Sequence, residues 1–152
     1  MATWQEIEQE APELAERVRT LFQSGTNKTI ATLRRDGSPR ISGTELEFKD
    51  GQVTLGMMPG SMKLLDVRRD PRVGIHSPTL EPPSNPSEWA GEAKLAGRLV
   101  EMDPPADTPF PGSGYFRVDI GEVVLTRVGT PADHLLIESW HEGRGWERRT
   151  RA

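Results

Sequence analysis

The residues of this chain that are best suited to bind an anion lie between Pro59 and Lys63, in the sequence PGSMK. The Pro-Gly pair predicts a tight turn, which places Ser61 at the cap of the helix that follows. The first backbone N–H groups of a helix have no partner within it, and the helix dipole adds partial positive charge there. Together with the Ser61 hydroxyl and the Lys63 ammonium, these groups suit a phosphate. The same sequence also suits an ordinary capped surface helix with solvated basic side chains, and the residues alone favour neither interpretation.

Other kinds of catalytic site have little support in the sequence. The three histidines, His76, His134 and His141, lack the close spacing of metal ligands on one helix or strand, so we expect no metal site. The chain has no cysteine, which excludes disulfides, thiolate ligands and cysteine nucleophiles. No G-x-S-x-G, G-x-G-x-x-G or P-loop pattern occurs, and no pair of carboxylates stands out as a general acid and base. Any catalysis would therefore depend on a bound cofactor.

Two helical segments are expected to position these residues. Over residues 3–23 apolar side chains recur at the helical period, and Thr3 and Glu6 have the spacing of a capping box. Pro12 divides this segment, which predicts a short first helix and a main helix that begins at the proline. Another short helix is expected over residues 61–70. Ser61 can cap its start, and the proline that directly follows Asp70 ends it.

Most of the remaining chain alternates between strands and turns. We expect Ile41, Leu46 and Phe48 to face inward and Gly43 to mark a bulge. The proline-rich segment 78–88 is expected to be a long loop with a functional role, and residues 103–114 form a second proline-rich connection. The expected strands cover residues 28–33, 40–48, 52–57, 72–76, 93–102, 114–125 with a possible extension to 128, 134–140 and 146–150. This pattern predicts an α+β protein dominated by an antiparallel barrel of six to seven strands.

The composition is that of one domain spanning residues 1–152. Only 34% of the residues are hydrophobic, which favours a small barrel that completes its burial by dimerisation. The net charge of −4 gives no general attraction to nucleic acids or anionic membranes, although Arg68, Arg69 and Arg72 form a local basic cluster. The N-terminal sequence is polar and acidic, and no stretch approaches the roughly 20 apolar residues of a membrane span. We therefore expect a soluble, cytoplasmic protein.

The segment SMKLLDVRRDPRV, residues 61–73, resembles the phosphate-binding motif of the pyridoxamine 5′-phosphate oxidase-like split barrels. The match covers its serine, its lysine and its D-P-R-V ending, and the turns at Asp36–Arg40 and Asp50-Gly51 also fit the family. The resemblance spans roughly residues 12–102. It implies a split β-barrel with Greek-key-like connections, a homodimer with cofactor sites at the subunit interface, and FMN or the deazaflavin F420 as cofactor.

The resemblance also assigns roles to individual residues. Candidates for the substrate side of the cofactor are His76, Trp140, His141 and Trp146, although we favour structural roles for His76 and for the two tryptophans. The residues assigned to cofactor binding are Arg40, Ser42, Gly56, Met57, Met58, Ser61, Lys63 and Lys94.

Three departures from the family pattern bear on function. Met62 stands where the motif has a second basic residue, the C-terminal segment 139–149 shares only tryptophans and arginines with the oxidases, and the chain is shorter. We therefore do not expect oxidation of pyridoxamine 5′-phosphate itself. The resemblance implies an oxidoreductase that transfers hydride between FMN or F420 and a small conjugated substrate. A non-catalytic module that binds a flavin or a tetrapyrrole is one alternative, and a cofactor-free interaction domain, which Met62 and Glu92 favour, is another.

Overall fold

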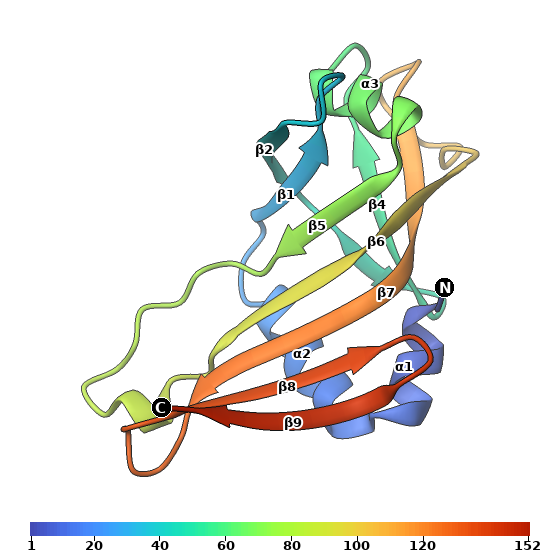
Figure 1. Ribbon diagram of the computed structural model, residues 1–152. Helices are drawn as coiled ribbons and strands as arrows, with labels where there is room; N and C mark the ends of the chain where they lie inside the picture. The colour runs from blue at the N-terminus through green and yellow to red at the C-terminus, as the bar shows by residue number, and fades with distance from the viewer.

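The computed structural model describes residues 1–152 and contains one nine-stranded sheet in which all paired strands are antiparallel. The sheet curls into a barrel, with α1 and α2 towards one end of the molecule and α3 at the other (Figure 1). In chain order the elements are α1 (Trp4–Glu10), α2 (Pro12–Phe22), β1 (Lys28–Leu33), β2 (Pro39–Thr44), β3 (Glu47–Lys49), β4 (Gln52–Met57), α3 (Met62–Arg69), β5 (Arg72–His76), the 3₁₀ turn η1 (Pro86–Glu88), β6 (Glu92–Met102), β7 (Gly114–Val128), β8 (Leu135–His141) and β9 (Gly145–Arg151).

The strand order explains how the barrel closes. The sheet follows the order β2-β1-β5-β6-β7-β4-β3, and β8 and β9 extend it from β7. Because β3 follows β2 after a short connection, the two ends of this order are joined by the chain itself. The expected α+β class, the antiparallel barrel, the N-terminal helices and the short helix are confirmed, with nine strands instead of six to seven.

The N-terminal segment forms the two expected helices. The Thr3 backbone N–H donates to the Glu6 carboxylate at 2.9 Å, and the Glu6 N–H donates to the Thr3 hydroxyl at 3.2 Å, so the capping box is confirmed. Pro12 is the first residue of α2, as predicted. The apolar stripe is buried, and Trp4 packs against Phe48 of β3 with ring centroids 4.9 Å apart. The helices therefore cover the base of the barrel and contribute to its core. None of the helices has both the length and the apolar composition needed to cross a membrane.

The expected strand over residues 40–48 is two strands, and part of its expected orientation is wrong. Leu46 and Phe48 pack against the core as predicted, but the side chain of Ile41 is 74% exposed. Alternation along β2 turns Arg40 and Thr44 inward instead, because Arg40 reaches the buried carboxylate of Asp66. A buried ion pair thus decides which face of this edge strand is the inner one.

The expected bulge at Gly43 is also wrong. Gly43 pairs with Thr29 in a regular register, whereas the register of β6 and β7 shifts between Ala96 and Gly97. A side chain at Gly97 would collide with the backbone carbonyl of Asp119, so only glycine permits this close approach of the two strands.

The long strand β7 connects two parts of the sheet. From Tyr115 to Thr126 it pairs with β6, while its first residues also pair with β4 and its last ones with β8. The predicted extension of this strand to Val128 is confirmed. The predicted strands 134–140 and 146–150 correspond to β8 and β9, and β9 pairs only with β8, so its other edge is free.

Candidate functional site

A cleft of about 640 Å³ lies on the outer side of the barrel, where β2, β3, β4 and the start of β7 come together. Its walls are residues 43–47, residues 54–58, Lys63, and the loop between β6 and β7. A second hollow, called the groove below, adjoins it and is lined by Arg34, residues 40–43 and residues 61–63. The cleft and the groove share Gly43 and Lys63, so they form one continuous depression with Lys63 at the junction.

Strand β4 gives the cleft a flat floor. Val53, Leu55 and Met57 are buried in the core, so alternation directs Thr54 and Gly56 to the opposite, cleft face. Gly56 is exposed and has no side chain, and it pairs with Tyr115 of β7, whose ring therefore projects on the same face. A glycine floor beside an aromatic ring leaves room for a flat ligand.

The start of α3 forms the polar end of this depression. Gly60, at φ +74°, makes the tight turn after β4, and the Ser61 hydroxyl accepts the Leu64 N–H at 3.4 Å, so the predicted cap is confirmed. The backbone N–H groups of Met62 and Lys63 have no hydrogen-bond partner in the structure. Both donors are therefore available to an anion.

Lys63 lies in the first turn of α3, and its side chain has no carboxylate partner. Its ammonium donates to the backbone carbonyl of Gly43 at 2.6 Å, and no ion pair includes it. Burial lowers the pKa of Lys63, because the charged form loses hydration without gaining an opposite charge. An anion bound beside Lys63 would supply that charge.

The arginines around α3 are already paired with carboxylates. Asp66, only 2% exposed, accepts hydrogen bonds from Arg40 Nε at 2.7 Å, from the Thr32 hydroxyl at 2.8 Å and from Arg69 at 3.1 Å. Burial alone raises the pKa of Asp66, but these hydrogen bonds outweigh it and hold the pKa below its ordinary value.

The other two arginines of this cluster pair with carboxylates near the surface. Arg68 makes a two-pronged contact with Glu101, and Arg72 binds Asp70 at 2.7 Å. The Arg72 guanidinium lowers the pKa of Asp70 to about 2. The basic cluster in the sequence therefore serves mainly to fix α3 against neighbouring strands.

The structure brings most of the predicted cofactor-binding residues together. Arg40, Ser42 and Ser61 line the groove, Lys63 lies at the junction, and residues 56–58 line the cleft. Lys94 is the exception, since it lies on β6 opposite His76 and Val124 and lines neither hollow.

The substrate-side candidates lie outside the cleft and the groove of this chain. His76 contacts the Ser77 carbonyl and, at 3.2 Å, Glu92. Trp140 is buried and donates to Glu10 at 3.0 Å, while His141 contacts Glu122 at 2.8 Å. Trp146 is opposite Trp140 in the hairpin of β8 and β9. Within one chain, these residues line neither hollow.

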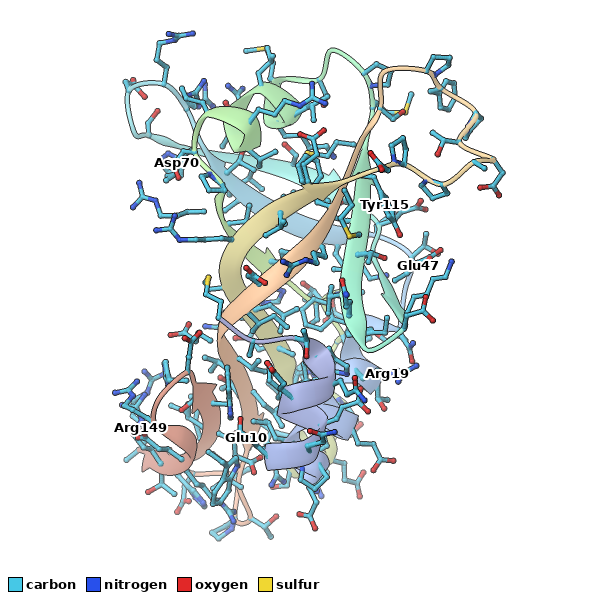
Figure 2. The ribbon with its side chains drawn as sticks, turned by 90° about the vertical axis from the view of Figure 1, so that its right-hand side faces the viewer. Glu10, Arg19, Glu47, Asp70, Tyr115 and Arg149 are labelled. Atoms are coloured by element: carbon cyan, nitrogen blue, oxygen red, sulfur yellow. The ribbon has the colours of Figure 1, made fainter.

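Sequence reasoning missed the loop that walls the cleft. Pro104, Pro105 and residues 107–110 line it, including Asp107 and the half-exposed Phe110. Figure 2 shows Tyr115 and Glu47 on the same side of the barrel, with Arg149 at the opposite side. The proline content of this loop was visible in the sequence, but its position depends on the pairing of β4 with β7. The loop at 78–88, which was expected to be functional, lines neither the cleft nor the groove.

Comparison with solved structures finds proteins of similar fold. No family model matches the chain, and no curated protein matches it. A pyridoxamine 5′-phosphate oxidase-related, FMN-binding protein from Nostoc punctiforme is similar in structure, with a TM-score of 0.62, 12% identity, and coverage of 100% of this chain and 98% of that one. PhzG from Burkholderia lata, solved with tetrahydrophenazine-1-carboxylic acid, gives a TM-score of 0.65 at 11% identity over 95% of this chain and 91% of its own.

Proteins with other described functions have the same architecture. A heme-binding protein from Mycobacterium smegmatis has a TM-score of 0.56 and 15% identity, over 91% of this chain and 88% of its own. A protein described as an F420 reductase has a TM-score of 0.52 and 15% identity, over 69% of this chain and 94% of its own. At these identities the similarity concerns the fold. The chain therefore has the split-barrel fold of the pyridoxamine 5′-phosphate oxidase-like proteins.

Proposed function

We propose that this protein binds FMN or F420 in the cleft and acts as an oxidoreductase on a small conjugated substrate. The observation that carries the proposal is the junction at Lys63, where an unpaired ammonium and two free backbone N–H groups adjoin a cleft with a flat floor at Gly56. A phosphate at the junction and a tricyclic ring along β4 would use both features. The FMN-binding and F420 proteins that share the fold support the same assignment.

The residues fit such a cofactor in a second respect. The Thr54 hydroxyl is buried and has no hydrogen-bond partner, and Thr54 lines the cleft on the same face as Gly56. A buried polar group without a partner is costly, so a ligand that donates or accepts a hydrogen bond there would relieve this cost.

Each part of the chain has a distinct task in this proposal. When bound, a flavin or deazaflavin supplies hydride transfer at its central ring. Lys63 and the start of α3 hold the phosphate, and Gly56 lets the backbone of β4 approach the ring. Phe110 and Tyr115 flank the ring and exclude water from one side. No histidine lines the cleft, so we expect positioning, and not a histidine acid or base, to govern the reaction.

The test is a visible absorption spectrum of the purified protein followed by titration with FMN, F420 and hemin. Saturable binding of FMN or F420 is expected, and Lys63→Met should weaken it roughly 10- to 100-fold through loss of a charge-assisted contact. Lys49→Met is the matched control, because Lys49 lines the same cleft on β3, away from α3. Equal effects of the two variants, or no binding of either cofactor, would contradict the proposal.

A non-catalytic binding module is the second candidate. It is favoured by the lack of an acid–base pair in the cleft and by the heme-binding protein that shares the fold. Since no histidine lines the cleft, heme iron would need Met58, Lys63 or Tyr115 as its ligand. Tight binding of hemin without binding of FMN or F420 would favour this candidate, and turnover of a bound reduced cofactor with a substrate would exclude it.

We also propose that the protein forms a homodimer through the sheet face opposite α1 and α2. On β7 and β8 the core side is occupied by Val123, Leu125 and Trp140, so alternation places Val124 and Ile137 on the other face. These side chains are only partly buried in one chain. A second copy would complete their burial, as the low apolar content of the sequence suggests.

A further inference from the structure

The strands β6, β7, β8 and β9 lie side by side, with α1 and α2 behind this part of the sheet (Figure 1). Their core side is occupied by Val123, Leu125 and Trp140, so the residues that alternate with these lie on the other side, called the outer face below. Two rows of cross-strand neighbours follow from the register on this face, and in the order β6 to β9 they are Glu92, Thr126, Ile137 and Arg149, and Lys94, Val124, Ser139 and Glu147.

Each row has opposite charges at its two ends, and the order of the signs is reversed between the rows. In the first row Glu92 lies on β6 and Arg149 on β9, whereas in the second row Lys94 lies on β6 and Glu147 on β9. The two ends are three strand spacings apart, about 14 Å, so they cannot form ion pairs with each other within one chain.

These four charges have little compensation from elsewhere in the chain. No ion pair includes Lys94 or Arg149. Glu92 contacts His76 at 3.2 Å, and Glu147 approaches the exposed Arg144 at 3.6 Å, which are weak contacts near the surface. The ends of both rows are therefore available to a partner.

The middle of the outer face is apolar. Val124 and Val128 on β7 and Ile137 and Leu135 on β8 are only partly buried, and they lie between the charged ends of the rows. An apolar centre with a charged rim is typical of the surface through which one protein binds another.

A second copy of the chain fits this pattern of charges. A two-fold axis parallel to the strands and between β7 and β8 places each β6 residue opposite the β9 residue of the same row in the other copy. Glu92 then faces the partner's Arg149, and Lys94 faces the partner's Glu147. The strands of the two sheets stay aligned, which is one of the two usual arrangements of packed sheets.

Another orientation of the axis matches less of the face. An axis perpendicular to the strands would bring Lys94 opposite the partner's Glu92, but it would set Glu122 and His141 against apolar side chains of β7 and β8. With the parallel axis, Glu122 faces the partner's His141 in the next row along the strands. The parallel axis therefore satisfies three successive rows.

We infer that the outer face is a self-complementary interface whose two-fold axis runs along β7 and β8, and that ion pairs of Glu92 with the partner's Arg149 and of Lys94 with the partner's Glu147 set this axis. The inference rests on the proposed homodimer and adds the geometry that specifies it. The charges select the orientation of the second copy, and the apolar centre contributes the burial.

Charge reversals at one pair of positions test the axis, with dissociation constants of the dimer measured by sedimentation equilibrium. Lys94→Glu and Glu147→Lys each create like-charge contacts across the interface, and each should raise the dissociation constant about tenfold or more. An equimolar mixture of the two variants should restore dimers as tight as those of the wild type, because every introduced charge then faces its opposite. With the perpendicular axis, the mixture would stay weak.

The matched control for the reversals is Arg148→Glu. Arg148 lies on the same strand as Glu147 but pairs with Glu138 on the core side, so this variant should dimerise like the wild type. Glu92→Arg and Arg149→Glu form a second pair for the same mixing experiment. Wild-type dimers that mixing fails to restore in both pairs, or an equal loss in Arg148→Glu, would overturn the inference while leaving the proposed homodimer intact. A monomeric wild type would overturn both.

Discussion

Arg40 of β2 donates a hydrogen bond of 2.7 Å from Nε to Oδ2 of Asp66 on α3. This contact joins the edge strand of the barrel to the helix whose first residues form the polar end of the cleft. Thr32 of β1 and Arg69 bind the same carboxylate, so a single buried group holds two strands and one helix in register. The position of Lys63, three residues before Asp66, depends on this anchor.

Replacing Asp66 with Asn should lower the free energy of unfolding by about 2–3 kcal/mol, because Arg40 and Arg69 would lose their carboxylate. The measurement is urea unfolding followed by tryptophan fluorescence. Glu101→Gln is the control, since its ion pair with Arg68 is about half exposed and should contribute little. An equal loss in both variants would show that Asp66 is not a special anchor.

The contribution of Asp66 should depend on pH in a defined direction. Its pKa is lowered in the folded protein, so its stabilising effect is complete above the unfolded pKa of about 4 and is lost as pH falls through the folded pKa. The difference in unfolding free energy between the wild type and Asp66→Asn should therefore be constant from pH 7 to 5 and shrink below about 4. Asp70 is present in both proteins and cancels from this difference. A difference that grows on acidification would contradict the assignment.

Gly97 permits the closest approach of β6 and β7, and Gly97→Ala should destabilise the protein by about 2–3 kcal/mol through a clash with the Asp119 carbonyl. Gly74→Ala on the neighbouring strand β5 is the control, because a methyl group there would meet nothing within 4 Å. Melting temperatures of the two variants provide the comparison. Similar values would mean that the strands separate easily at the bulge.

Phe110 is expected to contact the cofactor ring from the loop between β6 and β7. Phe110→Ala should weaken binding of the preferred cofactor by roughly 2- to 10-fold, the usual range for one aromatic contact, without changing the melting temperature. Trp146→Ala is a suitable control, since both side chains are 49% exposed but Trp146 lies outside the cleft. A greater loss of binding in Trp146→Ala would show that the ring lies elsewhere.

The proposed dimer can be tested with one charged substitution. Ile137→Glu should yield a monomer in light scattering after size-exclusion chromatography, because the carboxylate would be buried in the interface. Ile41→Glu makes the same change on β2, where the side chain is largely exposed, and should leave the dimer intact. A monomeric wild-type protein would contradict the proposal directly.

Much of the fold could be predicted from local signals. The Thr3–Glu6 capping box, Pro12 at the start of α2, and Ser61 at the start of α3 all act within a few residues, and all are confirmed. The orientation of β2 was not predictable in this way. It depends on the contact of Arg40 with a carboxylate 26 residues away, which outweighs the burial of Ile41.

In the candidate site too, features set by neighbouring residues were predictable, whereas features set by contacts between distant residues were not. The Ser61–Lys63 segment was found because its turn, cap and charge are contiguous in the sequence. The loop with Phe110 was missed as a wall of the cleft, because its place follows from the pairing of Gly56 with Tyr115. The charges of the arginines were equally visible, but only the structure shows that Arg40 and Arg69 share Asp66 and that Arg68 pairs with Glu101.

The free outer edge of β9 has a consequence for solubility. An unpaired strand edge exposes backbone groups that can pair with another chain and start aggregation. Here Arg148, Arg149 and Arg151 have no carboxylate partner, and they give this strand an excess of positive charge. Two such strands brought side by side would repel each other, so the last residues of the chain protect the sheet from growing by the addition of further copies.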